Sequence, residues 1–387
     1  MKTLRSGRNR RKWIYVLLLM GLLGLSGCGS PSSASVEMSS QTELVKTGSM
    51  ELQYAENFAV DYYEDGYKML TTLPDSKRYL IVPEGQPVPR GLDEDVSILQ
   101  EPLQNIYLVA SGVMDMFASV DAVDQVRFSG QKQENWYIQT AKDAMAAGDM
   151  IYAGKYSKPD YELLVSEGCD LAIENRMITH SPEVVEMLQS FDIPVMIEYS
   201  SYEQHPLGKV EWVKFFGALT GKEAEAEEAF AEQTEILEKV ESGEKTGKTI
   251  AFFYVTSNGL IQVRQSTDYI PKLIELAGGR YIFEDLEDSG SGRSTLNMQV
   301  EDFYAGAKDA DILIYNSSID GGVTMLDELI GKCNILKDFK ALQEGQVYCT
   351  TNDMYQQSMA IGYLLQDMHT VLTDDDTAKL RYLFLLQ

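Results

Sequence analysis

The sequence has few of the residues that metal and catalytic sites use. Its 387 residues include three histidines, at positions 180, 205 and 369, and four cysteines. A zinc or manganese site built on several histidines is therefore not expected. The nucleophile-elbow, zinc-protease and phosphate-loop motifs are also missing from the sequence. No nucleophile and base stand out as a pair, so we expect neither an enzyme nor a resident cofactor.

Basic residues are scarce as well. Lysine and arginine total 33 against 59 aspartates and glutamates, which gives a formal net charge of −26. Such a chain is repelled by a phosphate backbone, so we expect no nucleic-acid partner.

The hydrophobic content of 44% is ordinary for a globular protein. The length allows two domains of the usual size.

The N-terminus carries a short apolar run from Trp13 to Leu25. Thirteen residues are too few to span a bilayer as a helix. A basic stretch precedes the run, and together they are typical of a secretory signal peptide, here residues 1–27. The basic residues are Lys2, Arg5, Arg8, Arg10, Arg11 and Lys12. Their removal with the signal would make the chain more acidic still.

The apolar run ends in Leu25-Ser26-Gly27-Cys28, which resembles the lipobox of bacterial lipoproteins. The resemblance implies that Cys28 becomes the lipid-bearing first residue, anchored to the cell membrane on its extracytoplasmic face. Ordinary secretion or an uncleaved anchor is the alternative. Residues 28–50 are rich in serine and poor in apolar residues, which predicts a flexible tether.

The three other cysteines match no zinc spacing. Cys333 and Cys349 would be free to pair in an oxidising compartment, and the sequence leaves this open. Cys169 precedes an apolar run, which favours a small buried side chain.

Helices and strands alternate in two parts of the chain, which predicts an α/β fold with mostly parallel sheets. The first part is expected at 51–205 and the second at 247–387. The segments YELLVSEGCDLAI at 161–173 and DFYAGAKDADILI at 302–314 share one order of elements: helix, turn, aspartate, strand. We therefore predict two similar α/β lobes.

Residues 206–246 are the most helical part of the chain. Apolar residues recur at helical spacing before Thr220, and Thr220-Gly-Lys-Glu223 has the form of a capping box. This predicts Thr220 as the N-cap of a helix that runs from Lys222 to about Glu241. We expect that helix to connect the two lobes, the alternative being an acidic surface helix within one of them.

Tyrosines, a tryptophan and two arginines fall where strands should end. In open α/β sheets, ligands bind beyond the carboxyl ends of the strands. Side chains with an aromatic body and a polar tip suit a large, partly polar ligand there. Any one of these residues, taken alone, is equally well explained as a half-buried residue of the surface. The candidate ligand-binding residues are Ser111, Trp136, Tyr137, Asn175, Arg176, Tyr199, Arg264, Tyr315 and Tyr355.

The chain resembles the substrate-binding lipoproteins of ABC importers for iron–siderophore and cobalamin-type ligands. The resemblance is distributed over most of residues 51–372. Its clearest segments are DYYEDGYKML (61–70), EPLQNIYLVASGVMDMF (101–117), HPLGKVEWVKFFGALTGKEAEAE (205–227), DYIPKLIELAGGRYIFED (268–285) and VEDFYAGAKDADILIYN (300–316). It implies two Rossmann-like lobes joined by a single long helix, the class III arrangement.

The resemblance also implies partners. A metal chelate of the iron–siderophore type would bind between the lobes of a monomer and pass to an ABC permease with its ATPase. A glutamate on each lobe would dock on the permease, at positions that match Glu162 and Glu301, with Asp302 as a near alternative. Acidic residues at a helix N-terminus also simply favour the helix dipole. The other functions considered are cobalamin or haem binding, a lipid-anchored sensory or adhesion module, and an extracellular hydrolase or chelate reductase.

Overall fold

The computed structural model describes residues 44–286, 294–317, 322–374 and 377–387. The predicted signal peptide and the lipidation site Cys28 lie outside these residues. None of the helices in the described ranges is both long and apolar enough to cross a membrane. The predicted tether ends earlier than residue 50, because Lys46–Ser49 forms strand β1 and pairs with β2.

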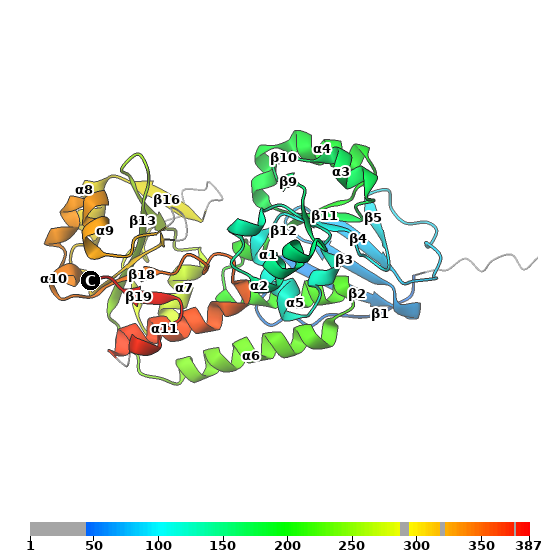
Figure 1. The fold of residues 1–387 in the computed structure, drawn as a ribbon. Coiled ribbons are helices and arrows are strands. Elements are labelled where there is room, and N and C mark those ends of the chain that lie inside the picture. The colour runs from blue at the N-terminus through cyan, green and yellow to red at the C-terminus, as the bar shows by residue number, and fades with distance from the viewer. Residues whose placement is uncertain (1–43, 287–293, 318–321, 375–376) are drawn as a thin grey trace, which may run out of the picture. The chain divides into compact units, whose positions relative to one another are not determined.

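The first lobe contains a five-stranded sheet in the order β12-β11-β6-β7-β8, in which every pairing is parallel. This confirms the α/β alternation predicted from the sequence. Figure 1 labels two strands of the sheet, β11 and β12. Its strands are β6 (Ile106–Leu108), β7 (Phe128–Ser129), β8 (Ile151–Tyr152), β11 (Leu171–Asn175) and β12 (Val195–Glu198). Its helices are α1 (Ser111–Ser119), α2 (Gln139–Ala147), α3 (Tyr161–Ser166) and α4 (Pro182–Ser190), with a small hairpin of β9 (Gly154–Lys155) and β10 (Lys158–Pro159).

The second lobe contains a seven-stranded mixed sheet. Strand β13 is central and lies parallel to β17, which in turn lies parallel to β18. The strands are β13 (Thr249–Val255), β14 (Ile261–Arg264), β15 (Arg280–Tyr281), β16 (Thr295–Met298), β17 (Ile312–Tyr315), β18 (Val347–Thr350) and β19 (Leu383–Leu385). The helices are α7 (Tyr269–Leu276), α8 (Val300–Ala307), α9 (Leu326–Lys332), α10 (Lys340–Gln343) and α11 (Ile361–Thr373).

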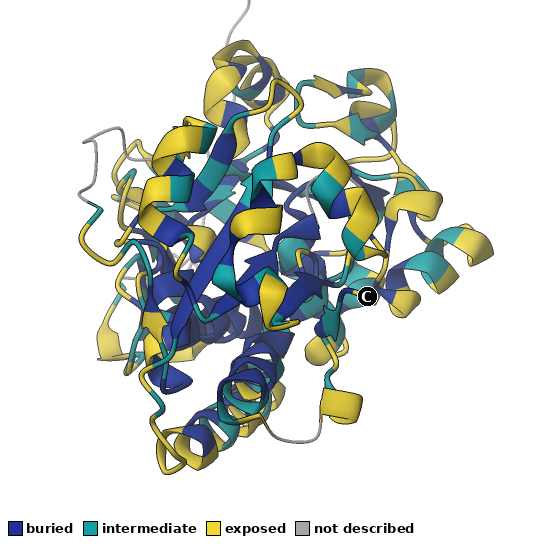
Figure 2. Ribbon diagram, turned by 90° about the vertical axis from the view of Figure 1, so that its left-hand side faces the viewer, coloured by how far each residue is buried: buried dark blue, intermediate teal, exposed yellow. Residues whose placement is uncertain are grey.

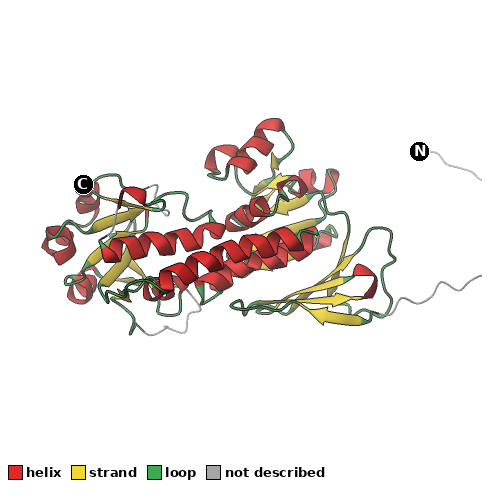
Figure 3. Cartoon of the chain, turned by 90° about the horizontal axis from the view of Figure 1, so that it is seen from below, coloured by secondary structure: helices red, strands yellow, loops and turns green. Residues whose placement is uncertain are grey.

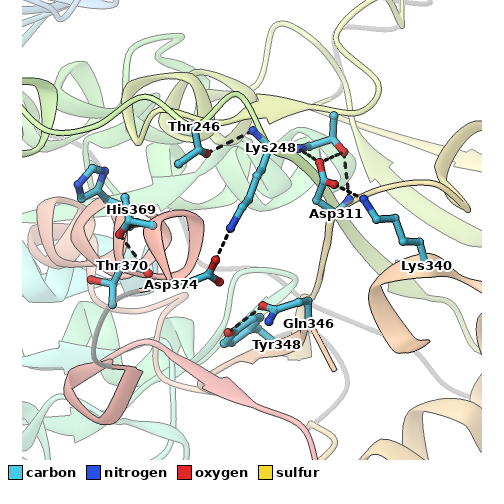
Figure 4. A network of polar contacts seen from close by, with 11 residues as sticks. Thr246, Lys248, Asp311, Lys340, Gln346, Tyr348, His369, Thr370 and Asp374 are labelled. Carbon is cyan, nitrogen blue, oxygen red and sulfur yellow. Dashed lines mark hydrogen bonds and ion pairs between the residues drawn. The ribbon is translucent and has the colours of Figure 1, made fainter. Parts of the chain in front are cut away.

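The aspartate that precedes a core strand has the same task in both lobes. Asp170, before β11, accepts hydrogen bonds from the backbone N–H groups of Gln104 and Asn105 at 3.0 and 2.9 Å, beside the start of β6. Asp311, before β17, accepts from the N–H of Thr249 at 2.7 Å, at the start of β13 (Figure 4). Each carboxylate therefore joins the amino ends of two neighbouring strands, which explains the matching segments in the sequence.

Figure 4 also shows how polar groups close this amino end of the second sheet. Lys340 donates to Asp311 at 2.5 Å, and Lys248 pairs with Asp374 at 2.5 Å. Burial acts to raise the pKa of Asp311, but the hydrogen bonds from Lys340 and Thr249 prevail and lower it. Because these side chains occupy the amino ends of the strands, a ligand is expected at the opposite, carboxyl ends.

An antiparallel sheet near the N-terminus was not expected from the sequence. It has the order β1-β2-β3-β4-β5, with only β4 and β5 parallel. Phe58 of β2 packs edge-on against Trp212, with ring centroids 4.9 Å apart, so the sheet shares the core of the first lobe. The strands are β1 (Lys46–Ser49), β2 (Phe58–Tyr63), β3 (Lys68–Thr72), β4 (Lys77–Val82) and β5 (Val96–Gln100).

Two helices lead from the first lobe to the second, α5 (Pro206–Thr220) and α6 (Glu223–Glu241). The long α6 packs along α5 and α11, and Figure 3 shows the long helices running alongside one another. The predicted N-cap is wrong: the Thr220 hydroxyl donates to the carbonyl of Phe216, inside α5, at 2.7 Å. Gly221, with φ 73°, ends α5 in the left-handed conformation, and Lys222 is the N-cap of α6.

The strands of the sheets are largely buried, while the helices around them expose their outer faces (Figure 2). All residues of β6, β17 and β18 are buried, as continuous apolar strands covered on both faces should be. Cys333 and Cys349 are buried and are not joined in a disulfide, and Cys169 is half-buried.

Candidate functional site

A cavity of about 250 Å³ lies at the carboxyl ends of strands from both lobes. From the first lobe it is lined by the residues that follow β6, β11 and β12, and from the second by β14, the start of α7 and the residues after β17. The lining consists of Ala110, Ser111, Gly112, Asn175, Arg176, Met177, Glu198, Ser200, Ser201, Tyr202, Lys209, Gln262, Arg264, Asp268, Tyr269, Ser294, Thr295, Asn316, Met354, Tyr355 and Ser358. This is where an open α/β sheet binds its ligands.

Five of the nine residues predicted to contact a ligand line this cavity: Ser111, Asn175, Arg176, Arg264 and Tyr355. Ser111 begins α1 directly after β6, and Asn175 ends β11. Tyr355 is the most exposed of them, with 63% of its surface accessible. Ser111, Asn175 and Arg176 were predicted because they end or follow apolar runs that form strands, and Arg264 and Tyr355 because they lie in polar settings of the second lobe.

The other four predicted residues do not line the cavity, which corrects the sequence-based assignment. Trp136 is 1% exposed, and its indole N–H donates to the Ser129 hydroxyl at 3.0 Å, so it is a core residue. Tyr315 is fully buried against Phe253. Tyr199 is 7% exposed and Tyr137 faces solvent outside the cavity. These aromatic residues have polar neighbours in the sequence, and those neighbours did not reveal that the ring of Trp136 or Tyr315 is buried in the core.

Sequence reasoning missed the charged and aromatic residues that helices contribute, above all Lys209, Asp268 and Tyr269. Lys209 lies in α5 and is 8% exposed. The sequence carried one signal for it: Lys209, Glu211 and Lys214 interrupt an otherwise apolar helix in which almost every residue is buried. Charged residues at buried positions of a helix need partners or a task.

An ion pair holds one wall of the cavity. Arg264 lies 3.4 Å from the Asp268 carboxylate, and its guanidinium stacks over the ring of Phe252. Burial acts to lower the pKa of Arg264, but the negative charge of Asp268 prevails and raises it. Asp268 in turn accepts the N–H of Ile270 at 2.9 Å, as the N-cap of α7. Arg264 is thus fixed in position and charged.

The opposite wall carries Arg176 and Glu198. The guanidinium of Arg176 lies 4.5 Å from the ring centroid of Tyr202, which also lines the cavity. Glu198 accepts hydrogen bonds from the N–H and the hydroxyl of Ser200, at 2.8 and 2.5 Å. Burial raises the pKa of Glu198, and these hydrogen bonds oppose the rise.

Lys209 occupies the wall between these two. Its ammonium lies 4.9 Å from the ring centroid of Tyr269, a cation–π contact. No hydrogen bond or ion pair joins this ammonium to another side chain or carbonyl in the described ranges of the chain. The site therefore combines polar amides and hydroxyls, tyrosine rings and a nearly buried cation, a set that binds a partly polar ligand.

The two acidic residues predicted to dock on a permease are exposed and are not part of the cavity lining. Glu162 lies in the first turn of α3, and Glu301 in the first turn of α8. Each is thus at the start of the helix that precedes a core strand. Groups of three or more His, Cys, Asp or Glu that could hold a metal ion do not occur in the described residues.

Known proteins share the sequence pattern and the fold of this chain. A family model described as periplasmic binding protein matches residues 111–354. An uncharacterized lipoprotein of Methanocaldococcus jannaschii is 24% identical over 396 residues, which cover 93% of this chain and 92% of the relative. A second uncharacterized lipoprotein of that organism is 23% identical and covers 89% and 90%.

Solved structures share the fold at low identity. A Fe³⁺-hydroxamate transport protein from Saccharomonospora viridis is 16% identical with a TM-score of 0.55, covering 70% of this chain and 93% of that one. The periplasmic haem-binding protein HutB of Vibrio cholerae is 14% identical with a TM-score of 0.55, covering 69% and 98%. The antiparallel sheet β1–β5 precedes the residues that the family model matches.

Proposed function

This chain belongs to the periplasmic binding protein family, and we propose that it captures a metal chelate of the iron–siderophore type outside the cytoplasm and delivers it to an ABC permease. The observation that carries the proposal is the cavity, which takes its lining from the strand ends of both lobes. Tyr202, Tyr269 and Tyr355 supply aromatic surface, and Asn175 and Asn316 supply amides. Such a lining suits a large ligand that is apolar in part.

The anchor at Cys28 is part of the same proposal. The lipobox-like Leu25-Ser26-Gly27-Cys28 supports it, and the two relatives from Methanocaldococcus jannaschii are named lipoproteins. A lipid on Cys28 would keep the protein at the extracytoplasmic face of the membrane, close to its permease. Replacement of Cys28 by serine should release the protein from the membrane fraction, and retention of the variant in that fraction would contradict the anchor.

Calorimetric titration of the purified protein tests which class of ligand it binds. The panel consists of a ferric trihydroxamate, a ferric tricatecholate, ferric citrate, haem and cyanocobalamin. We expect saturable binding of one ferric chelate, weakened in Tyr355→Ala, which removes a ring that is 63% exposed and so should leave folding intact. Binding of haem or cyanocobalamin alone would change the ligand class. Binding of none would contradict the proposal and favour a sensory module.

We also propose that Glu162 and Glu301 dock on the permease. The double variant Glu162→Arg, Glu301→Arg should lose chelate uptake in cells and keep its chelate affinity. The matched control is Glu183→Arg with Asp327→Arg, which reverses two other exposed charges in the first turns of α4 and α9. Loss of uptake in the control as well, or normal uptake in the double variant, would refute the docking assignment.

A further inference from the structure

We propose that the ligand carries a carboxylate group and that the Lys209 ammonium binds it, an inference that rests on the proposed chelate-binding function. Lys209 enters the cavity from α5 and is 8% exposed. The ring of Tyr269 lies 4.9 Å from this ammonium, and Asp115, Glu198 and Asp268 interact with it electrostatically without forming an ion pair. An ammonium has three N–H donors, and none of them has an acceptor within the described part of the chain.

Burial makes this arrangement costly without a ligand. Removing an ammonium from water is costly unless an anion or several acceptors replace the lost hydration. The cation–π contact with Tyr269 and the more distant carboxylates replace only part of it, because none of them accepts a hydrogen bond from the ammonium. A carboxylate that enters the cavity would supply the missing acceptor together with a negative charge in direct contact.

The carboxylates around Lys209 are already engaged with other donors. Asp268 has Arg264 and the N–H of Ile270, and Glu198 has Ser200. Asp115 of α1 lies beyond the cavity lining and accepts the N–H of Met359 at 2.7 Å. None of the three lies within 4.0 Å of the Lys209 ammonium, so none forms an ion pair with it.

The charges of the lining also favour a ligand with few negative charges. The cavity has three cations, Arg176, Lys209 and Arg264, and two carboxylates, Glu198 and Asp268. Among the lining residues one positive charge is therefore in excess, while Asp115 acts on Lys209 from outside the lining. A strongly anionic tricatecholate would find too little positive charge, and a neutral trihydroxamate would leave the excess charge unbalanced. A chelate that presents one carboxylate to Lys209 matches the lining.

The test compares the wild type with Lys209→Met by calorimetric titration of ferric citrate, haem and a neutral ferric trihydroxamate. Ferric citrate and haem both carry carboxylates. We expect ferric citrate to bind the wild type and to lose about 100-fold in affinity in Lys209→Met; the same loss with haem alone would keep this inference and change the ligand class of the proposed function. Lys209→Arg should keep part of the affinity, because the charge remains. The matched control is Lys272→Met, which removes an exposed lysine of α7 that pairs with Glu275 and should bind as the wild type does.

Thermal unfolding separates ligand binding from a structural role. Lys209→Met relieves the burial of an ammonium without a hydrogen-bond partner but also removes a charge that acts on Asp115, Glu198 and Asp268, so we expect only a small change in the stability of the free protein. A large loss of stability would show a structural role instead. Chelate affinity would then be compared between the wild type and Lys209→Gln, which keeps a hydrogen-bond donor without the charge.

The outcomes distinguish this inference from the function on which it rests. Tight binding of the neutral trihydroxamate alone, or an undiminished affinity of Lys209→Met for ferric citrate and haem, would overturn the inference and leave the chelate-binding function standing. An equal loss of affinity for charged and neutral chelates would also overturn it. Absence of binding to any chelate would overturn both.

Discussion

The side-chain amide of Gln356 accepts a hydrogen bond from the backbone N–H of Tyr137 at 2.8 Å, although the two residues are 219 positions apart. The same amide donates to the carbonyl of Asn135 at 2.8 Å. One side chain of the second lobe thus satisfies two backbone groups of a first-lobe loop. Gln356 is the residue after Tyr355, which lines the cavity. We call its two hydrogen bonds to the loop the Gln356 clasp, because they hold the two lobes together beside the candidate site.

Gln356→Ala should loosen the clasp. The variant leaves an N–H and a carbonyl of the loop without partners, which should lower the free energy of unfolding by about 1–3 kcal/mol. The amide of Tyr137 should exchange hydrogen faster, and chelate affinity should fall, because the walls of the cavity are less well fixed. The control is Gln139→Ala, whose hydrogen bond to Asp143 stays within α2. Unchanged exchange at Tyr137 in Gln356→Ala would contradict the clasp.

Glu174 should make stability depend on pH. It is fully buried in β11, and burial raises its pKa to about 8. Among the residues that the structure describes, neither of its carboxyl oxygens has a hydrogen-bond partner. The unfolded chain releases this proton near the ordinary pKa of about 4.3, so between these values the folded protein binds more protons. Stability should therefore fall as pH rises through this window, by up to about 1.4 kcal/mol per pH unit, and stay low above it.

Glu174→Gln removes this titration while keeping the shape of the side chain. Urea unfolding of both proteins from pH 5 to pH 9 gives the difference in their free energies of unfolding. We expect the wild type to lose stability relative to the variant as pH rises. Parallel curves for the two proteins would show that Glu174 keeps one charge state throughout.

The N-terminal sheet should depend on one buried carboxylate of α5. Glu211 is 0% exposed and accepts the N–H groups of Gln53, Tyr54 and Ala55 at 2.8–3.1 Å. Glu211→Gln puts an amide donor opposite these donors and should cost about 2–5 kcal/mol in the free energy of unfolding.

Glu227→Gln is the matched control for this prediction. Its side chain is 64% exposed and pairs with Lys214, which also lies near Glu211. We expect a change below about 1 kcal/mol, as for exposed ion pairs in general. Equal effects of the two substitutions in urea unfolding would mean that the contacts of Glu211 with residues 53–55 contribute little.

Trp136 should affect stability and not ligand binding. Truncation of a fully buried tryptophan costs about 3–5 kcal/mol, so Trp136→Ala should unfold at lower urea concentration. The folded variant should bind its ligand as the wild type does, because the ring is outside the cavity lining. A fall in affinity larger than the unfolded fraction explains, measured by calorimetry, would return Trp136 to the site.

The regular part of the fold was predictable from the sequence because parallel strands buried on both faces are continuous apolar runs. β6 (Ile106–Leu108) is of this kind, and the apolar run at 171–173 opens β11 before Glu174, within the segment 161–173 that was predicted to contain helix, turn, aspartate and strand. The β1–β5 sheet was not predicted, although β4 ends in a buried apolar run, because no local pattern shows that β2, β3 and β4 pair antiparallel with one another. Its attachment to α5 depends on Glu203 and Glu211, which local patterns cannot connect with residues 53–57.

The candidate site was predictable only in part, for a similar reason. Asn175 and Arg264 occupy strand ends, and the position of a strand end can be read from the sequence. The direction of a side chain in a loop depends on packing against distant residues, as for Trp136 and Ser129. Lys209 faces the cavity because of how α5 packs between the lobes, which no local pattern contains.

The most direct test of the account is a crystal structure of the protein with the ferric chelate that binds in calorimetry, using the anomalous scattering of iron to locate the metal. We predict one iron peak inside the cavity, with the chelate in contact with Tyr355, Arg264 and Lys209. An iron peak outside this cavity, or an empty cavity in crystals of the saturated complex, would contradict the proposed function.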